Sequence, residues 1–541
     1  MSDQRLGDRR GKRRTARGAV AAGTALLLAA LGSTLLGVPG AAAVPRAEPP
    51  PPDPQLTTED VDSAVSKLDG QIRAGMEESG VPGVAVAVVH DDRVVYLKGF
   101  GEREVGEAGG VSPDTVFQIA SLSKPVTSTV IADAVGDEAI AWDTPVAGHV
   151  PGFALKDPWV SRHATVADLL SHRSGLPDHA GDLLEDLGYD QEYILSRMRM
   201  EPLSPFRASY AYTNFGVTAA AEAAADAKGT SWQELAEESL FEPAGMDSTS
   251  TLFADYEKAP DRAVTHVETA DGTWEARFVR DPDAQAPAGG VSSTARDMAA
   301  WMRIQLANGR LGDEQIVPAE PLGRTHLPEI VSQPPENPAG RTGFYGLGWN
   351  VGYDDQGRLR LNHSGAFALG ANTNVTLLPS ERLGIVILTN GMPVGLADAI
   401  AFDFLDTAEY GEPTRDWLPA VRQVYEAQER EERSPTDYTR PPADAADARP
   451  DDSYTGTYRN AYYGPATVTA DGEDGLVLRL GPDGMRFPLT PFDGDTFSFE
   501  TTGENAVGRT GVTFTVGEDG TATRMTVERL DGNGLGTFTR G

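Results

Sequence analysis

The chain has 541 residues, more than one small core needs, so we expect two or three folding units. Acidic residues outnumber basic ones by 80 to 46, and the formal net charge of −34 disfavours binding to nucleic acid or anionic lipid. The sequence contains no cysteine, which excludes disulfide bonds, and its histidines lack the spacing of metal ligands. We therefore expect no metal and no other cofactor.

Residues 1–43 are typical of a secretory signal peptide. Basic side chains precede an apolar run from about residue 19 to 36, and small residues follow it, which predicts cleavage after Ala43. The pair Arg13-Arg14 leaves open whether export uses the general or the twin-arginine route. No later apolar run is long enough to span a bilayer, so we expect a secreted, extracytoplasmic protein.

Residues 44–56 form a proline-rich linker, and the first folded element is expected to begin near Thr57. Apolar residues then recur every three or four positions up to about Glu78, which is typical of an amphipathic helix. A run of small and β-branched residues at 83–89 and a second run at 93–100 flank a short turn. They predict a β-hairpin.

Ser121 and Lys124 stand three positions apart in the sequence Ser-Leu-Ser-Lys. On a helix such residues are neighbours, so a hydroxyl nucleophile would lie beside an amine whose pKa burial would lower. Of the seven lysines, Lys124 is the one with a serine three positions before it. A serine at a helix start is also a common N-cap, so the pair alone does not decide the function.

Up to about residue 400, alanine-rich helical stretches alternate with glycine- and proline-containing loops, and strands return near the end. The expected elements are helices at 217–227 and 294–308, strands at 358–362, 372–378 and 383–389, and a helix at 395–408. Strands at both ends with helices between them predict an α/β (α+β) domain over residues 57–411. It would consist of an antiparallel sheet flanked by helices, with a helical lobe inserted between the two chain ends.

Residues 412–450 are rich in proline, acid and arginine and predict a linker with one exposed helix at about 418–430. Residues 451–541 change character, because short alternating runs are separated by Asp-Gly turns. This pattern predicts a small C-terminal antiparallel β-barrel or sandwich.

Two further motifs follow Ser121 along the chain: Tyr212-Thr213-Asn214 before an alanine-rich helix, and His363-Ser364-Gly365 at a strand. Each is weak alone, and Arg341-Thr342-Gly343 competes with the second of them. His363 is preferred because strand-like residues flank it on both sides.

In this order, S-x-x-K, Y-x-N and a basic residue followed by Ser-Gly resemble the penicillin-recognising serine hydrolases, most closely the branch of class C β-lactamases, DD-peptidases and esterases. Further stretches that resemble the family lie at 82–88, 168–177, 289–298 and 345–349. The C-terminal stretches 454–464 and 535–538 resemble the lipocalin-like domain often appended to such hydrolases.

The resemblance implies acyl transfer through Ser121. Its Oγ would attack a carbonyl carbon while Lys124 and Tyr212 share the proton. We expect the lysine ammonium to lower the pKa of Tyr212, so that the phenol can protonate the leaving group.

The resemblance also implies five substrate-binding residues. Asn214 would orient Lys124 and a substrate amide, and the backbone N–H of Ala366 would complete an oxyanion hole with that of Ser121. His363, with Ser364 and Gly365, would line the site. Histidine replaces lysine here, so the residue would supply a hydrogen bond rather than a fixed charge.

We therefore expect a hydrolase of amide or ester bonds with a small-molecule or peptide substrate, such as a D-alanyl peptide, a D-amino-acid derivative or an ester. A β-lactamase proper and a non-catalytic sensor of penicillin or peptidoglycan remain alternatives, and the oligomeric state is open. His172 and His179 are expected to be structural.

Overall fold

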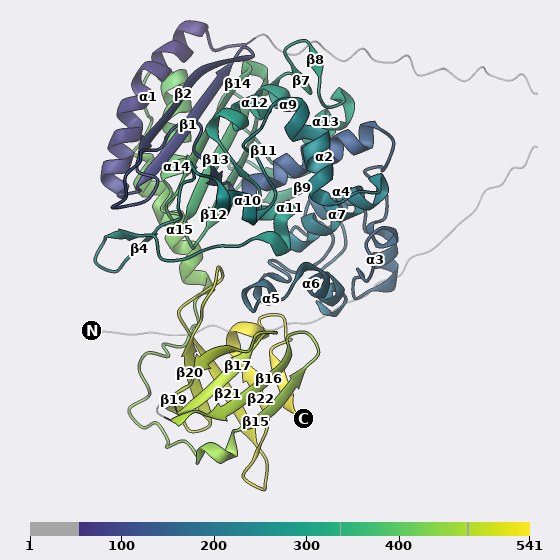
Figure 1. The fold of residues 1–541 in the computed structure, drawn as a ribbon, viewed down its shortest axis with the longest axis vertical. Helices are drawn as coiled ribbons and strands as arrows, with labels where there is room; N and C mark the ends of the chain where they lie inside the picture. The colour runs from purple at the N-terminus through teal and green to yellow at the C-terminus, as the bar shows by residue number, and fades with distance from the viewer. Residues whose placement is uncertain (1–53, 336, 473–474) are drawn as a thin grey trace, which may run out of the picture. The chain divides into compact units, whose positions relative to one another are not determined.

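The computed structural model describes residues 54–541 except 336 and 473–474. The predicted signal peptide and nearly all of the proline-rich linker lie outside the described residues. The described residues belong to one compact unit, in which an α/β domain is followed by an all-β domain (Figure 1).

The α/β domain is built on an eight-stranded antiparallel sheet with the strand order β2-β1-β14-β13-β12-β11-β10-β9. Strands from the two ends of the domain lie side by side in this sheet, because Val84 of β1 pairs with Thr389 of β14. This is the sheet of two chain ends that the sequence predicts. Its strands are β1 (Gly83–His90), β2 (Arg93–Gly101), β9 (Ile330–Gln333), β10 (Gly343–Tyr345), β11 (Asn350–Tyr353), β12 (Leu359–Phe367), β13 (Ala371–Leu378) and β14 (Leu383–Thr389).

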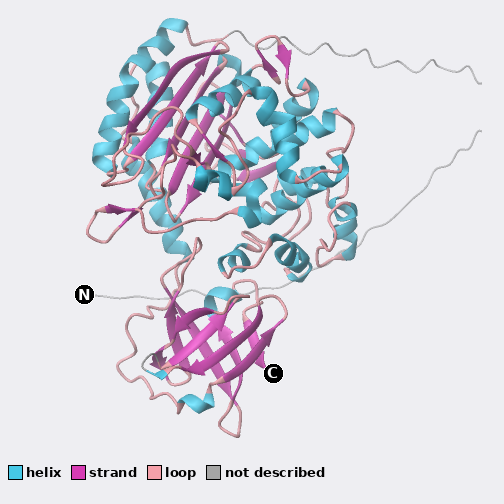
Figure 2. Ribbon diagram, in the orientation of Figure 1, coloured by secondary structure: helices cyan, strands magenta, loops and turns pink. Residues whose placement is uncertain are grey.

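Helices α1 (Thr58–Ser79) and α14 (Leu396–Tyr410) cover one face of this sheet (Figure 2). A capping box formed by Thr57 and Asp60 starts α1, and Gly80, in the left-handed conformation, ends it. Strand β1 is buried on both faces, since its valines at 84, 86 and 88 pack towards these helices and its alanines at 85 and 87 pack towards the other layer.

The helical lobe is inserted between β2 and β9 and lies on the other face, where α12 packs on β1 and β14. Its principal helices are α2 (Ser123–Gly136), α3 (Pro158–His163), α4 (Val166–Leu170), α5 (Asp182–Asp186), α6 (Gln191–Arg197), α7 (Asn214–Lys228), α8 (Trp232–Ala236), α10 (Phe253–Lys258), α11 (Ala286–Gly289), α12 (Ala295–Leu306) and α13 (Ala319–Thr325).

Helix α15 (Trp417–Glu432) occupies the segment that the sequence predicts as a linker. It packs on α14, where Leu418 is buried and the hydroxyl of Tyr425 donates to Asp398, so one face of this helix is covered rather than exposed.

The C-terminal domain is a nine-stranded antiparallel sheet that curls into a nearly closed barrel, with the order β18-β17-β16-β15-β23-β22-β21-β20-β19 (Figure 1). This confirms the expected β-barrel. Its strands are β15 (Gly456–Asn460), β16 (Gly464–Ala470), β17 (Leu476–Leu480), β18 (Met485–Pro488), β19 (Thr490–Asp493), β20 (Thr496–Glu500), β21 (Arg509–Val516), β22 (Ala522–Val527) and β23 (Thr537–Arg540).

Candidate active site

Ser121 lies in a tight turn, Ala120–Leu122, that leads directly into α2. The preceding Ala120 has a φ of +50°, a left-handed conformation that is unfavourable for a residue with a Cβ. Hydrogen bonds hold the turn in place: Ser123 Oγ donates to the carbonyl of Ala120 at 2.6 Å and accepts from the backbone N–H of Val291 at 3.0 Å. The strained backbone is thus fixed by its surroundings next to the serine.

Lys124 is completely buried one turn after Ser121. Its Nζ lies 3.0 Å from Ser121 Oγ, 2.7 Å from Asn214 Oδ1 and 3.0 Å from the carbonyl oxygen of Ala288. Burial lowers the pKa of Lys124 to about 7, although the charge of Asp182 opposes this shift. An amine with this pKa is partly unprotonated at neutral pH and can accept a proton from the serine.

Tyr212 approaches Ser121 from the loop just before α7, and its hydroxyl donates to Ser121 Oγ at 2.8 Å. The Nζ of Lys124 lies 4.5 Å from the centre of the tyrosine ring. The expected direction of the pKa shift is wrong, because burial raises the pKa of Tyr212 well above its usual value. The phenol is therefore neutral and suited to donate a proton rather than to remove one.

Asn214 joins Lys124 to an acidic side chain that the sequence analysis missed. Its Oδ1 accepts from Lys124, while its Nδ2 donates to Asp182 Oδ2 at 2.8 Å. Asp182 also lies 2.7 Å from Nδ1 of His179. Burial lowers the pKa of His179, but the hydrogen bond and charge of Asp182 outweigh it and raise that pKa to about 9. No local sequence pattern connects residue 182 with residue 214, so packing alone reveals this contact.

Strand β12 passes directly beside the serine turn. A Cβ placed on Gly365 would lie 2.3 Å from the carbonyl oxygen of Ile119 and 3.1 Å from the backbone nitrogen of Ser121. A side chain cannot occupy that space, so glycine is required for the approach. Thr373 of β13 reinforces the contact by donating to the carbonyl of Ile119 at 2.8 Å. Ala366 follows Gly365 on this strand.

His363 is buried on β12, with its ring 6.4 Å from that of Tyr212. Its Nε2 lies 2.9 Å from the hydroxyl of Tyr345, and its Nδ1 lies 2.8 Å from the carbonyl oxygen of Ser364. Burial and the nearby charge of Lys124 lower the pKa of His363 to about 3, so the imidazole is neutral. Both ring nitrogens have protein partners, and the expected hydrogen bond from His363 to a substrate is not available in this arrangement.

Ser364 lies on the other face of the sheet from His363, because successive side chains of a strand alternate. Its hydroxyl donates to Asp398 of α14 and accepts from the amide of Asn374. The expectation that the Ser364 side chain lines the site is therefore wrong.

The structure also locates two basic side chains that the sequence analysis placed outside the catalytic set, His172 and Arg341. His172 packs against Tyr212 and Tyr345, and its Nδ1 accepts from the backbone N–H of Thr213 at 3.1 Å. It supports the loop before α7. Arg341, the competitor of His363, is exposed and donates to the backbone carbonyl of Tyr353, so it does not reach Ser121.

The model of the family described as Beta-lactamase matches residues 68–407, more than half of the chain. The chain belongs to the beta-lactamase family. A second model, described as a domain of unknown function, matches residues 440–536, the barrel of this family member.

Curated relatives of this beta-lactamase family member include several hydrolases. It is 26% identical to "Unguisins hydrolase ungD'" of Aspergillus campestris, over 83% of this chain and 86% of the relative. It is 28% identical to penicillin-binding protein 4 of Amycolatopsis lactamdurans, over 58% of this chain and 82% of the relative. It is 27% identical to a D-aminopeptidase of Brucella anthropi, over 65% and 64% of the two chains.

Among solved structures, the octameric penicillin-binding protein homologue of Pyrococcus abyssi aligns with a TM-score of 0.56 and 22% identity, over 86% of this chain and 98% of that one. A class C beta-lactamase of Rhodobacter sphaeroides aligns with a TM-score of 0.52 and 21% identity, over 63% and 99% of the two chains. These likenesses support the fold.

Among residues 54–541, leaving aside 336 and 473–474, no group of His, Cys, Asp or Glu side chains is placed to hold a metal ion. Nor does any helix in this part of the family member have the length and apolarity to cross a bilayer.

Proposed function

We propose that the protein hydrolyses amide or ester bonds through an acyl-enzyme on Ser121. That it is a hydrolase of the serine β-lactamase and DD-peptidase family follows from the family match. The observation that carries the finer proposal is the convergence of Lys124 Nζ and the Tyr212 hydroxyl on Ser121 Oγ, at 3.0 and 2.8 Å.

In the proposed acylation, Ser121 Oγ attacks the carbonyl carbon and its proton passes to unprotonated Lys124. The backbone N–H groups of Ser121 and Ala366 stabilise the negative charge on the carbonyl oxygen. Tyr212 donates its proton to the leaving nitrogen or oxygen as the bond to carbon breaks, and the ammonium of Lys124 restores that proton. Asn214 holds the ammonium through Oδ1.

Deacylation uses the same groups in reverse. Water attacks the ester of Ser121, its proton is taken by unprotonated Lys124, and Tyr212 donates a proton to the serine oxygen as it leaves. The ammonium of Lys124 then restores the proton of Tyr212. Each step transfers a proton between neighbouring groups, and the backbone N–H groups stabilise the oxyanion.

For the substrate, we propose a D-alanyl peptide, a D-amino-acid derivative or an ester. The names of the relatives support a peptide-like substrate, since they include a D-aminopeptidase and the AmpH D-alanyl-D-alanine carboxypeptidase/endopeptidase of Escherichia coli. The neutral His363 lacks the fixed charge that would bind the carboxylate of a β-lactam, which favours a peptidase or esterase over a β-lactamase. We also propose that the protein is exported by means of residues 1–43.

The test is covalent labelling followed by turnover. Wild-type protein is incubated with a fluorophosphonate or a labelled penicillin, and intact mass spectrometry should show one adduct that Ser121→Ala abolishes. Steady turnover of nitrophenyl acetate should fall by roughly 10²–10⁴-fold in Tyr212→Phe. Tyr410→Phe, an exposed tyrosine on α14, is the matched control.

A wild-type protein that never gains mass, or a Ser121→Ala variant that gains as much, contradicts the proposal. One adduct without turnover of any ester, D-amino-acid peptide or cephalosporin would identify a sensor instead of an enzyme.

A further inference from the structure

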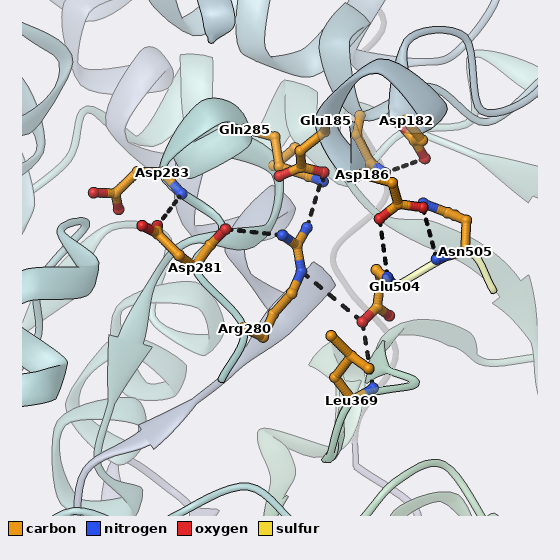
Figure 3. A network of polar contacts seen from close by, with 12 residues as sticks. Asp182, Glu185, Asp186, Arg280, Asp281, Asp283, Gln285, Leu369, Glu504 and Asn505 are labelled. Atoms are coloured by element: carbon orange, nitrogen blue, oxygen red, sulfur yellow. Dashed lines mark hydrogen bonds and ion pairs between the residues drawn. The ribbon is translucent and has the colours of Figure 1, made fainter. Parts of the chain in front are cut away.

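A loop of the C-terminal barrel, Gly503–Asn505, contacts two parts of the α/β domain that border the candidate active site. These parts are helix α5 and the turn that joins β12 to β13. Figure 3 shows Glu504 and Asn505 beside Asp186, Arg280 and Leu369. Asp186, the last residue of α5, accepts from the backbone N–H of Glu504 at 2.9 Å and from that of Asn505 at 3.0 Å. The side-chain amide of Asn505 donates to the same carboxylate at 2.9 Å.

Gly503 allows this close approach. Its φ is +99°, and a Cβ at this position would lie 2.6 Å from Asp186 Oδ1. Both the backbone conformation and the space therefore require glycine. The loop is shaped to fit α5, and α5 begins with Asp182, the residue that orients Asn214.

The side chain of Glu504 contacts the second of these parts, the turn between β12 and β13. Its carboxylate accepts from the backbone N–H of Ala368 at 2.6 Å and from that of Leu369 at 3.3 Å. These residues form the turn that joins β12 to β13, immediately after Ala366 and Phe367. Glu504 thus holds the end of the strand that carries the proposed oxyanion donor.

Arg280 also contacts Glu504 beside this turn. Its guanidinium lies 3.9 Å from Glu504, donates to Glu185 at 2.9 Å, and stands 5.0 Å from the centre of the Phe367 ring. Phe367 in turn packs on Ala120, the strained residue before the serine. The carboxyl group of Glu504 is therefore linked by contacts both to the β12–β13 turn and to the turn that carries Ser121.

We propose that Glu504 is a positioning residue for catalysis, and that the barrel serves the hydrolase by fixing the β12–β13 turn and α5 relative to Ser121. This inference rests on the proposed function, because it assigns the oxyanion to the N–H of Ala366. It gives a role to a domain whose family description states none.

Attachment of the barrel alone does not account for Glu504. The hydroxyls of Tyr189 and Tyr193 donate to the carbonyls of Tyr463 and Tyr462 at 2.7 and 3.0 Å, and these neutral bonds already join the two domains. Glu504, in contrast, is a largely buried carboxyl group that accepts from two N–H groups of the turn beside the site. These two bonds fix the β12–β13 turn, which the tyrosine bonds do not touch.

The experiment compares full-length variants in nitrophenyl ester turnover and in thermal unfolding. Glu504→Ala removes the acceptor for both turn N–H groups and should lower kcat roughly 10- to 100-fold, with KM changed by less than about 2-fold. Glu504→Gln keeps one carbonyl acceptor and should recover most of kcat. Tyr193→Phe removes a docking bond of similar length and should leave kcat unchanged.

Gly503→Ala gives an independent measurement. It keeps the Glu504 side chain, but its Cβ displaces the loop and so moves Glu504 away from the turn, and kcat should fall as in Glu504→Ala. The inference is overturned if Glu504→Ala and Gly503→Ala keep wild-type kcat, or if Tyr193→Phe loses as much activity as they do. Failure of the proposed function looks different, since wild-type protein itself would then form no adduct on Ser121.

Discussion

Burial sets the protonation of the ionisable side chains closest to Ser121. It lowers the pKa of Lys124 to about 7, raises the pKa of Tyr212, and lowers the pKa of His363 to about 3. Lysine is therefore the one of these three whose charge changes near neutral pH. The site works with an amine base and a phenol acid because a low-dielectric enclosure favours the neutral form of each.

The first prediction concerns the pH dependence of acylation. Lys124 must be unprotonated to accept the serine proton, so the rate of labelling by a fluorophosphonate should rise with pH around a midpoint near 7 and level off above it. Stopped-flow or quenched mass spectrometry from pH 5 to 9 measures this. A rate that falls across the same range would contradict the assignment of Lys124 as the base.

At this scale the sequence predicts contacts better than energies. The spacing of Ser121 and Lys124 is enough to predict their contact, because residues three apart on a helix are always neighbours. The pKa of Tyr212 depends on enclosure by residues from distant parts of the chain, which the motif does not contain. The orientation of Ser364 could have been predicted from the sequence. If the strand predicted at 358–362 continues through His363 and Ser364, alternation places these two side chains on opposite faces of the sheet.

Among the elements, the short helix α5 links the candidate active site to the C-terminal barrel. Its first residue, Asp182, binds Asn214 and His179, and its last, Asp186, binds the barrel loop. No helix is predicted at these positions, because five residues without a clear apolar period give no signal. Longer elements such as α1, α7 and α14 were predictable within a few residues.

The second prediction tests α5 through Asp182→Ala. Without the carboxylate, Asn214 loses the acceptor of its Nδ2 and keeps its bond to Lys124, so it is held less firmly and kcat should fall roughly 10-fold or more. The charge of Asp182 also favours the ammonium of Lys124, so its removal lowers the pKa of Lys124 and moves the midpoint of the pH–rate profile below 7. Glu192→Gln, an exposed acid on α6, is the control. An unchanged midpoint with normal kcat would exclude this role.

For the molecule as a whole, acidic groups buried between the two domains make stability depend on pH. Burial raises the pKa of Glu504 to about 8 and that of Glu185 to about 7, with Arg280 between them and Asp186 adjoining. Both folded-state values exceed those of the unfolded chain. Their stabilising contribution is therefore complete at low pH and is lost as pH rises through 7 to 8.

The third prediction follows from that sign. Between pH 6 and pH 9 the Tm of the wild type should fall by roughly 2 °C more than the Tm of Glu504→Gln, which cannot ionise at this position. Calorimetry on both proteins isolates the effect of Glu504, because Lys124, His179 and Glu185 titrate in each. Equal pH dependence in the two proteins would show that Glu504 does not ionise in this range.

The global arrangement was largely predictable from the order of elements. Strands near both ends of the α/β domain required one shared sheet, and Asp-Gly turns required an antiparallel C-terminal domain. The contact between the domains was not predictable, because it depends on single residues such as Gly503 and Asp186 that belong to no periodic pattern. The domain boundaries and the signal peptide stay predictions.

The pairing of β1 with β14 has a consequence for biosynthesis. Val84 leaves the ribosome long before its partner Thr389. Until β14 has been made, the valine-rich strand β1 has one edge of backbone N–H and C=O groups without its native neighbour. The central sheet can close only when nearly all of the α/β domain has been made, so folding is late and the nascent chain is exposed to aggregation. A chain truncated before β14 would keep that edge of β1 permanently unpaired.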